Sequence, residues 1–339
     1  MNYRKSLISG CAAFLLLVSC ALSFAQAAGN FEQELAAIQA AIRQKGAQWV
    51  AGETSLSRLS WDEWKMRVGV SLTQPNAPHL PEPIPSALPA SLDWRSYNGD
   101  YVTGIRDQKK CGSCWAFAMT AGLESYVLVT RHEPGTDMDL SEQVMLSCSG
   151  AGSCRGGTLD ADYLRSTGLP PEKYYPYTAA DGACSNAAPD WQKAAYQIGA
   201  WASVSQKLSA IKAALATYGP LPIAFMVYED FMHYKSGIYS YAAGKKLGGH
   251  AVLLVGYNDA EQYFIVKNSW GDKWGEDGFF KIAYSELNRP VDFGIITIAY
   301  QAQSEYPQGT SLAPVKRAAR HLSADEALKH LEPLLRQKP

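Results

Sequence analysis

The chain has 339 residues, of which 47% are hydrophobic and 19% charged, and its formal net charge at pH 7 is -1. This length allows a sizeable buried core and suggests about two domains. A net charge near zero produces no strong field, so nucleic acid and anionic membrane surfaces are not expected partners.

Residues 1–28 have the features of a secretory signal. A basic start, MNYRK, precedes an apolar run over residues 7–24, and small residues follow around Ala27 and Ala28. The run is short for a membrane span and contains Gly, Ser and Cys. The letters LVSC at 17–20 offer an alternative, a lipobox in which Cys20 carries lipid. We expect an exported protein, secreted or periplasmic, with membrane attachment only if Cys20 is lipidated.

The segment that follows, residues 29–87, is predicted to contain two helices and a linker. Residues 30 to about 74 are predicted to be mainly helical, and apolar residues at helical spacing favour a first helix from residue 30 to about residue 50. Ser60 is the predicted N-cap of a second, shorter helix, with Glu63 at the capping-box position. Six prolines between residues 75 and 89 then predict extended, cleavable chain.

The main body, residues 88–302, divides into a helix-rich part and a strand-rich part. Strands and a hairpin around Asn258 and Asp259 dominate the second part, so the fold class is α+β, with a cleft between the two parts as the expected site. Helices are predicted over 114–130, 140–147 (with Ser141 as N-cap), 158–168 and 206–219, and strands over 221–227, 250–257, 263–270, 279–284 and 294–300.

Residues 303–339 form a C-terminal extension. Ser323 and Glu326 have capping-box spacing and predict a terminal helix. A docking or anchoring element is the alternative interpretation.

The cysteines predict a reactive thiol. Seven are present, and two of them, Cys11 and Cys20, lie in the signal. The other five allow two disulfides and one free thiol in an oxidising compartment, although counting does not identify the free one. The CxxC pair of Cys111 and Cys114 could be a redox dithiol, a metal-ligand pair, or a reactive thiol beside a structural one. No second ligand pair follows, so no metal or other cofactor is expected.

A set of distant residues offers the parts of a thiol-based acyl-transfer site. Cys114 opens a predicted helix, whose N-terminus favours a thiolate. His250 and Asn268 lie on neighbouring predicted strands, where the asparagine can orient the histidine and Trp270 can shield their hydrogen bond. Gln108 can donate to an oxyanion. Each residue alone is more often structural, and only the combination indicates catalysis.

The motifs together resemble the papain/cathepsin family of cysteine peptidases. The stretch CGSCW at 111–115 is accompanied by LSEQVMLSC, CRGG, YPY, HAVLLVGY and KNSWGDKWGEDGFFKI, and the similarity runs from about Leu92 to Tyr300. The resemblance implies a papain-like two-domain fold, with a helix-rich half, an antiparallel β-barrel-like half and the active-site cleft between them. It also implies a monomeric cysteine endopeptidase made as a secreted zymogen, with residues 29–87 as its propeptide and inhibitor.

The resemblance assigns roles to individual residues. Cys114 is the implied nucleophile, paired as thiolate with the His250 imidazolium, and it forms a thioester acyl-enzyme. Asn268 orients His250, and Gln108 with the Cys114 backbone N–H binds the oxyanion. The implied disulfides are Cys111–Cys154 and Cys148–Cys184.

The implied substrates are peptides or proteins. Gly156 and Gly157 resemble the pair that binds the main chain of an extended substrate. Small or apolar residues near the P2 side chain favour an apolar P2 residue; they are Thr158, Leu159, Gly248, Ala251 and Ile298, with Trp270 also in the cleft.

The chain departs from the family pattern in two ways: it has no cysteine after Cys184, and Gly249 stands where Asp or Asn is common. Two further functions remain open, an inactive binding protein and an enzyme that cleaves non-protein amides such as cell-wall cross-links.

Overall fold

The computed structural model describes residues 31–81, 88–288 and 290–302. The predicted signal, the lipobox at Cys20, the chain around Ala87 and the C-terminal extension with its predicted helix at Ser323 lie outside these residues.

The N-terminal segment, residues 31–81, begins with a helix over residues 31–45. The predicted helix was expected to continue to about residue 50, but Gly46 adopts a positive φ of 64° that ends it. Residues 48–51 then form strand β1 (Gln48–Ala51), in which Trp49 and Ala51 are the buried, alternate positions. Helix α2 (Trp61–Lys65) starts at Ser60, whose side chain and that of Glu63 form the predicted capping box.

The helix-rich half is built on α3 (Cys114–Arg131), α4 (Glu142–Cys148) and α5 (Asp162–Ser166). Ser141 caps α4 as predicted, because its side chain accepts the Val144 N–H at 3.1 Å. Around these helices lie the short strands β3 (Gly152–Ser153) and β4 (Gly156–Gly157) and the 3-10 turns η1 (Glu172–Tyr174), η2 (Cys184–Asn186) and η3 (Trp191–Ala194).

The strand-rich half confirms the predicted α+β class. Its sheet follows the order β1-β7-β10-β9-β8-β6-β11-β5, with β2 paired to β8. This path is open, so the described strands form no closed barrel, and β7 and β10 pair in parallel. The elements are β2 (Ser91–Asp93), β5 (Ala200–Ser203), α6 (Leu208–Tyr218), β6 (Leu221–Tyr228), η4 (Glu229–His233), β7 (Tyr234–Tyr239), β8 (Lys246–Asn258), β9 (Tyr263–Lys267), β10 (Phe279–Ala283), η5 (Tyr284–Leu287) and β11 (Ile296–Gln301).

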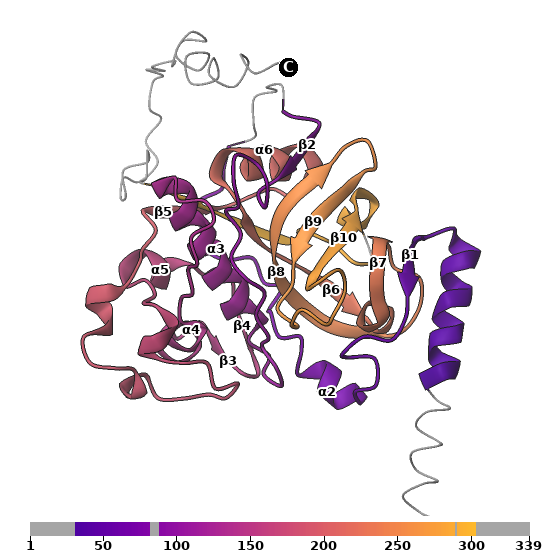
Figure 1. Ribbon diagram of the computed structural model, residues 1–339, viewed down its shortest axis with the longest axis horizontal. Coiled ribbons are helices and arrows are strands. Elements are labelled where there is room, and N and C mark those ends of the chain that lie inside the picture. The colour runs from indigo at the N-terminus through magenta and orange to yellow at the C-terminus, as the bar shows by residue number, and fades with distance from the viewer. Residues whose placement is uncertain (1–30, 82–87, 289, 303–339) are drawn as a thin grey trace, which may run out of the picture. The chain divides into compact units, whose positions relative to one another are not determined.

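Strand β8 is the centre of this arrangement, since it pairs with β6, β9 and β2. Figure 1 shows α3 beside β8, where the helix-rich half meets the strands, and the N-terminal helix beside β1 and β7. The first residue of α3 and the middle of β8 are therefore brought to one boundary between the halves.

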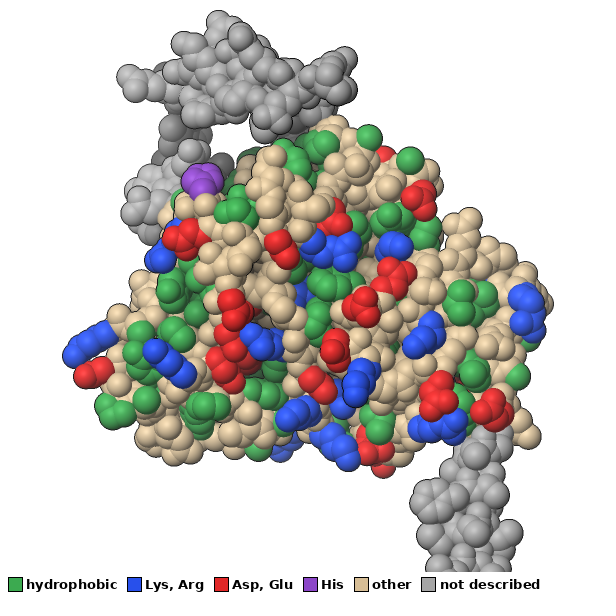
Figure 2. Space-filling model, viewed as in Figure 1, with side chains coloured by type: hydrophobic (Ala, Val, Ile, Leu, Met, Phe, Trp, Pro, Cys, Tyr) green, Lys and Arg blue, Asp and Glu red, His purple; other side chains and the backbone are tan. Residues whose placement is uncertain are grey.

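Lys/Arg and Asp/Glu side chains are interspersed over the face drawn in Figure 2. This agrees with the small net charge. Within the described ranges, every helix is too short or too polar to cross a bilayer.

Candidate active site

Cys114 is the first residue of α3 and has no solvent-exposed surface. The structure bonds Cys111 to Cys154 and Cys148 to Cys184, which leaves Cys114 as the free cysteine of the described residues. The Cys111–Cys154 bridge ties the residue three positions before the thiol to the loop between β3 and β4. The position of the Cys114 thiol is thus fixed by the N-terminus of α3 and by the Cys111–Cys154 disulfide.

His250 and Asn268 meet at the boundary between β8 and the end of β9. The His250 Nε2 and Asn268 Oδ1 atoms are 2.8 Å apart, and the same oxygen accepts the Ser269 backbone N–H at 2.8 Å. The bond from the Ser269 N–H identifies Asn268 Oδ1 as an oxygen, which can only accept, so His250 Nε2 donates the proton in their hydrogen bond. The other ring nitrogen, His250 Nδ1, has no hydrogen-bond partner among the described residues. Trp270 stacks on the imidazole with ring centroids 4.5 Å apart, so water is kept from this hydrogen bond.

Gln108 is held in one orientation by both halves of the protein. Its Nε2 donates to the Cys111 carbonyl at 2.8 Å, and its Oε1 accepts the Ser269 hydroxyl at 2.8 Å. The second Nε2 hydrogen remains available for an oxyanion. Sequence reasoning did not identify Ser269, although its position directly after Asn268 was a usable signal.

The N-terminal segment crosses the site directly over the thiol. The backbone N–H groups of Gly69 and Val70, together with those of Ala251 and Trp115, lie close enough to the Cys114 thiol to lower its pKa. Gly69 and Val70 also donate to the Gly249 carbonyl at 2.9 and 3.1 Å. The Cys114 thiol is therefore covered in part by main chain of the N-terminal segment.

The same segment pairs with Gly157 like a strand. The Gly157 N–H donates to the Gly69 carbonyl at 2.8 Å, the Ser71 N–H donates to the Gly157 carbonyl at 2.7 Å, and the bridge between Val70 and Gly157 is parallel. A Cβ on the neighbouring Gly156 would lie 2.5 Å from the Gly69 carbonyl oxygen, so glycine at that position allows the segment to approach. The segment thus uses the main-chain groups that the sequence assigned to substrate binding.

Side chains fix the segment on either side of the crossing. Arg67 forms an ion pair with Asp107 at 2.6 Å, and Trp270 Nε1 donates to the Arg67 carbonyl at 3.2 Å. Sequence reasoning did not predict this crossing. The alternation of Val68, Val70 and Leu72 with Gly69 and Ser71 was the available signal, since it is typical of a strand.

Burial sets the protonation of the covered pair. It raises the pKa of the Cys114 thiol to about 11, against the hydrogen bonds from backbone N–H groups, which lower it. It lowers the pKa of His250 to about 4, although the hydrogen bond to Asn268 raises it. Both shifts favour the neutral forms, so burial in this covered site opposes the thiolate–imidazolium pair that the resemblance implies for catalysis.

Three of the predicted side-chain subsite residues are almost fully buried, whereas Thr158 and Gly248 are half-buried. Leu159, Ala251 and Ile298 are at most 1% exposed. Ala251 lines a small cavity together with Asn268 and Ser269, whereas Leu159 and Ile298 do not line it.

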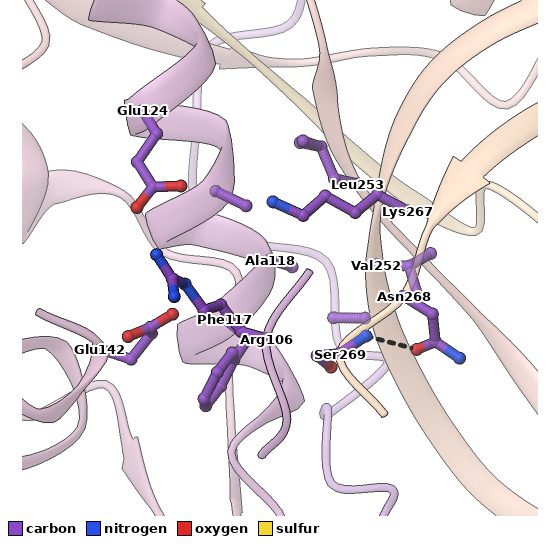
Figure 3. A pocket seen from close by; sticks show the side chains of 12 residues that line it. Arg106, Phe117, Ala118, Glu124, Glu142, Val252, Leu253, Lys267, Asn268 and Ser269 are labelled. Atoms are coloured by element: carbon purple, nitrogen blue, oxygen red, sulfur yellow. Dashed lines mark hydrogen bonds between the residues drawn. The ribbon is translucent and has the colours of Figure 1, made fainter. Parts of the chain in front are cut away.

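That cavity contains charged groups from both halves, as Figure 3 shows: Glu124 and Glu142 point into it from α3 and α4, and Lys267 points toward them from β9. The Lys267 amino group donates to the Thr103 hydroxyl at 2.9 Å, and that hydroxyl donates to Glu124. Burial raises the pKa of Glu124 and lowers the pKa of Lys267, while each acts on the other in the opposite direction. Lys267 directly precedes Asn268, so this network ties the end of β9 beside Asn268 to the helix of Cys114.

No group of three or more His, Cys, Asp or Glu side chains that could hold a metal ion is found within residues 31–81, 88–288 and 290–302.

Residues 88–299 match the family described as papain family cysteine protease, and the chain belongs to this family. It is 36% identical over 260 residues to the cathepsin B-like CP3 of Giardia intestinalis, a match that covers 71% of this chain and 86% of the relative. It is 38% identical over 206 residues to mouse pro-cathepsin H, covering 57% of this chain and 60% of that protein's length.

Solved structures of precursor forms have the same fold. The digestive procathepsin L2 proteinase of Tenebrio molitor larval midgut superimposes with a TM-score of 0.69 at 28% identity, covering 80% of this chain and 90% of that chain. The recombinant stem bromelain precursor gives a TM-score of 0.64 at 29% identity, covering 81% and 90%. The similarity thus extends over more of this chain than the protease family match alone.

Proposed function

We propose that the chain is the zymogen of an exported cysteine endopeptidase. The observation that carries this proposal is the free Cys114 at the start of α3. It lies near the main chain of Gly69 and Val70 and of Ala251, the residue that follows His250 of the His250–Asn268 pair. A thiol at a helix N-terminus with an oriented imidazole is the arrangement that nucleophilic thiol catalysis needs.

The proposed reaction is acyl transfer from a peptide. The Cys114 thiolate attacks the carbonyl carbon of the scissile bond, and the tetrahedral oxyanion accepts hydrogen bonds from Gln108 and the Cys114 backbone N–H. His250, oriented through Nε2 by Asn268, gives the Nδ1 proton to the leaving amine, and a thioester remains on Cys114. His250 then removes a proton from water, which attacks the thioester and releases the acid and the free thiol.

The N-terminal segment, residues 31–81, acts in this proposal as an inhibitory prosegment. Its main-chain hydrogen bonds to Gly157 and Gly249 occupy groups that a substrate would use in this proposal. The segment therefore competes with a substrate for the same backbone, and its bridge to Gly157 runs parallel to that strand. Removal of the segment exposes Cys114 and His250 to water, which reduces the desolvation penalty for forming the thiolate and the imidazolium. Cleavage is proposed near Ala87 or Leu88, within the proline-rich stretch.

The two disulfides support an oxidising location, as expected for an exported protein. Residues 1–28 are the proposed signal, residues 88–302 the proposed peptidase domain, and residues 303–339 a C-terminal extension.

The test is intact mass after treatment with a thiol-specific epoxide, using activated wild type and the Cys114→Ala variant. One adduct on wild type and none on the variant, with loss of peptide hydrolysis in both the treated and the variant enzyme, is the expected result. A wild type that gains no adduct and hydrolyses no peptide would refute the proposal. Parallel assays on cell-wall amide substrates separate peptidase from amidase activity.

A further inference from the structure

The hydroxyl group of Tyr177 bonds to two residues of the loop that precedes α3. It lies 2.9 Å from the Gln108 carbonyl oxygen and 2.7 Å from the Ser113 hydroxyl. A carbonyl oxygen can only accept, so Tyr177 donates its proton to Gln108 and accepts the proton of Ser113. A second acceptor for the Ser113 hydroxyl, the Cys111 carbonyl, lies at the longer distance of 3.5 Å.

The position of Ser113 makes its bond to Tyr177 informative. Ser113 is the N-cap residue of α3, and a serine at this position commonly caps its helix, but the Ser113 side chain makes no cap hydrogen bond. The hydroxyl is fully buried and is directed to Tyr177 instead. The contact therefore replaces the usual local use of an N-terminal serine.

The two bonds of the Tyr177 hydroxyl lead to both groups that donate to the oxyanion in the proposed reaction. One donor is the side-chain amide of Gln108, the residue whose carbonyl Tyr177 holds. The other donor is the Cys114 N–H, which belongs to the planar peptide unit between Ser113 and Cys114. One hydroxyl thus links the two residues whose backbone positions determine where these donors lie.

The surroundings of Tyr177 fix its side chain in place. Its ring packs edge-on against Phe117 of α3, with ring centroids 4.8 Å apart, and its N–H donates to Glu172 Oε1 at 2.6 Å. Burial raises the pKa of the Tyr177 hydroxyl, against the hydrogen bond from Ser113, which lowers it. The hydroxyl therefore keeps its proton and can donate to Gln108.

We propose that Tyr177 is a positioning residue for the oxyanion hole, and that its hydroxyl fixes the Gln108 amide and the Cys114 N–H relative to each other. Ser269 holds Gln108 from the strand-rich half, because its carbonyl accepts the Gln108 N–H at 2.9 Å, and Tyr177 holds it from the helix-rich half. The inference rests on the proposed function, because both donors act on the oxyanion of that reaction. Such donors stabilise the transition state only when they lie about 3 Å from the developing charge.

The test compares peptide hydrolysis by the activated wild type and by Tyr177→Phe. Loss of the hydroxyl should lower kcat about tenfold and change KM by less than about twofold, because misplaced oxyanion donors weaken binding of the transition state rather than of the substrate. Tyr175→Phe is the matched control. Tyr175 lies two residues away and its hydroxyl also donates to a main-chain carbonyl, that of Ala183 at 3.1 Å, so kcat should stay unchanged in this variant.

Two further measurements separate this role from a general loss of structure. In a Gln108→Ala background, Tyr177→Phe should lower kcat by less than about threefold, since one of the donors that Tyr177 positions is already absent. The rate of Cys114 alkylation by iodoacetamide should change by less than about twofold, because this displacement forms no oxyanion.

An unchanged kcat in Tyr177→Phe would overturn the inference. An equal loss of kcat with and without Gln108, or a tenfold slower alkylation of Cys114, would also overturn it, and in each case the proposed function would stand. If Tyr177→Phe does not fold, Ser113→Ala removes one of the two bonds and should lower kcat about threefold with KM unchanged. An unchanged kcat in Ser113→Ala would then overturn the inference, whereas absence of any Cys114-dependent hydrolysis by wild type would overturn the proposed function as well.

Discussion

At the scale of single residues, the environment of Cys114 differs from that expected of a helix-terminal thiol. The sequence places it at the start of α3, where the helix dipole favours a thiolate. In the structure, burial under the N-terminal segment outweighs the dipole and the backbone N–H donors, and the thiol is neutral. Covering the nucleophile is thus itself a means of inhibiting it, in addition to blocking the substrate.

The pKa directions predict how the thiol of the full-length chain reacts with pH. Because the pKa of Cys114 is raised to about 11, the reactive thiolate is scarce below that pH, and the alkylation rate should rise only as pH approaches 11. Once the prosegment is removed, burial no longer lowers the pKa of His250 to about 4, so its imidazolium can form beside the thiolate. The increase in alkylation rate with pH should then occur at acidic pH.

Alkylation by iodoacetamide, followed by mass spectrometry from pH 4 to 11, measures both profiles. The Cys114→Ala variant gives the background. A full-length chain already fully reactive at pH 6 would contradict the neutral covered pair.

Ser269 is predicted to orient Gln108 for catalysis. Ser269→Ala removes the donor to Gln108 Oε1, a neutral hydrogen bond worth on the order of 1 kcal/mol, so kcat should fall about fivefold with little change in KM. Gln108→Ala removes the oxyanion donor itself and should lower kcat by about 100-fold or more. Steady-state kinetics of the activated variants measure both effects. Ser269→Thr retains the hydroxyl and should restore kcat, whereas failure to do so would indicate a different role for Ser269.

At the scale of elements, the buried network of Figure 3 joins α3 to the end of β9. Lys267→Met is predicted to destabilise the protein by about 3–5 kcal/mol, because it leaves the buried Glu124 without a compensating cation. Urea unfolding of the Cys114→Ala background measures the change.

The double variant Lys267→Met with Glu124→Gln should recover part of this loss, since the carboxylate of Glu124 is then absent while Glu142 remains in the same cavity. Equal instability of the single and double variants would mean that packing, rather than charge, determines the cost.

Sequence patterns predicted the elements whose signal is local. Ser60 and Ser141 begin their helices where capping chemistry indicates, and α3 begins at Cys114. Strand β1 was assigned to a helix because its partner, β7, lies nearly 190 residues further along the chain and no local pattern reveals that pairing. The crossing of Gly69 near the thiol was missed for the same reason, since it depends on close approaches to the distant glycines Gly112, Gly156 and Gly249.

At the scale of the whole described molecule, the prosegment pairs with strands near both ends of the sheet order. Strand β1 pairs with β7 at one end. At the other end, the Leu80 N–H donates to the Ser203 carbonyl of β5 at 2.9 Å, and the Ser203 N–H donates to the Pro78 carbonyl at 2.8 Å. Removal of the prosegment would therefore leave main-chain groups of both β7 and β5 without these partners.

This arrangement predicts that the prosegment stabilises the folded peptidase domain. A segment that binds only the folded state, present at about 100 times its dissociation constant, adds about 2.7 kcal/mol. For a domain of this size that corresponds to a rise in Tm of about 5–10 °C. The Cys114→Ala chain can be cut within residues 82–87 by an added protease and the prosegment then separated. Calorimetry should show that the separated peptidase domain has a Tm about 5–10 °C below that of the intact chain. A cut but unseparated sample should retain most of the original Tm. An equal Tm for the separated and intact chains would show that the contacts at β7 and β5 contribute no net stability.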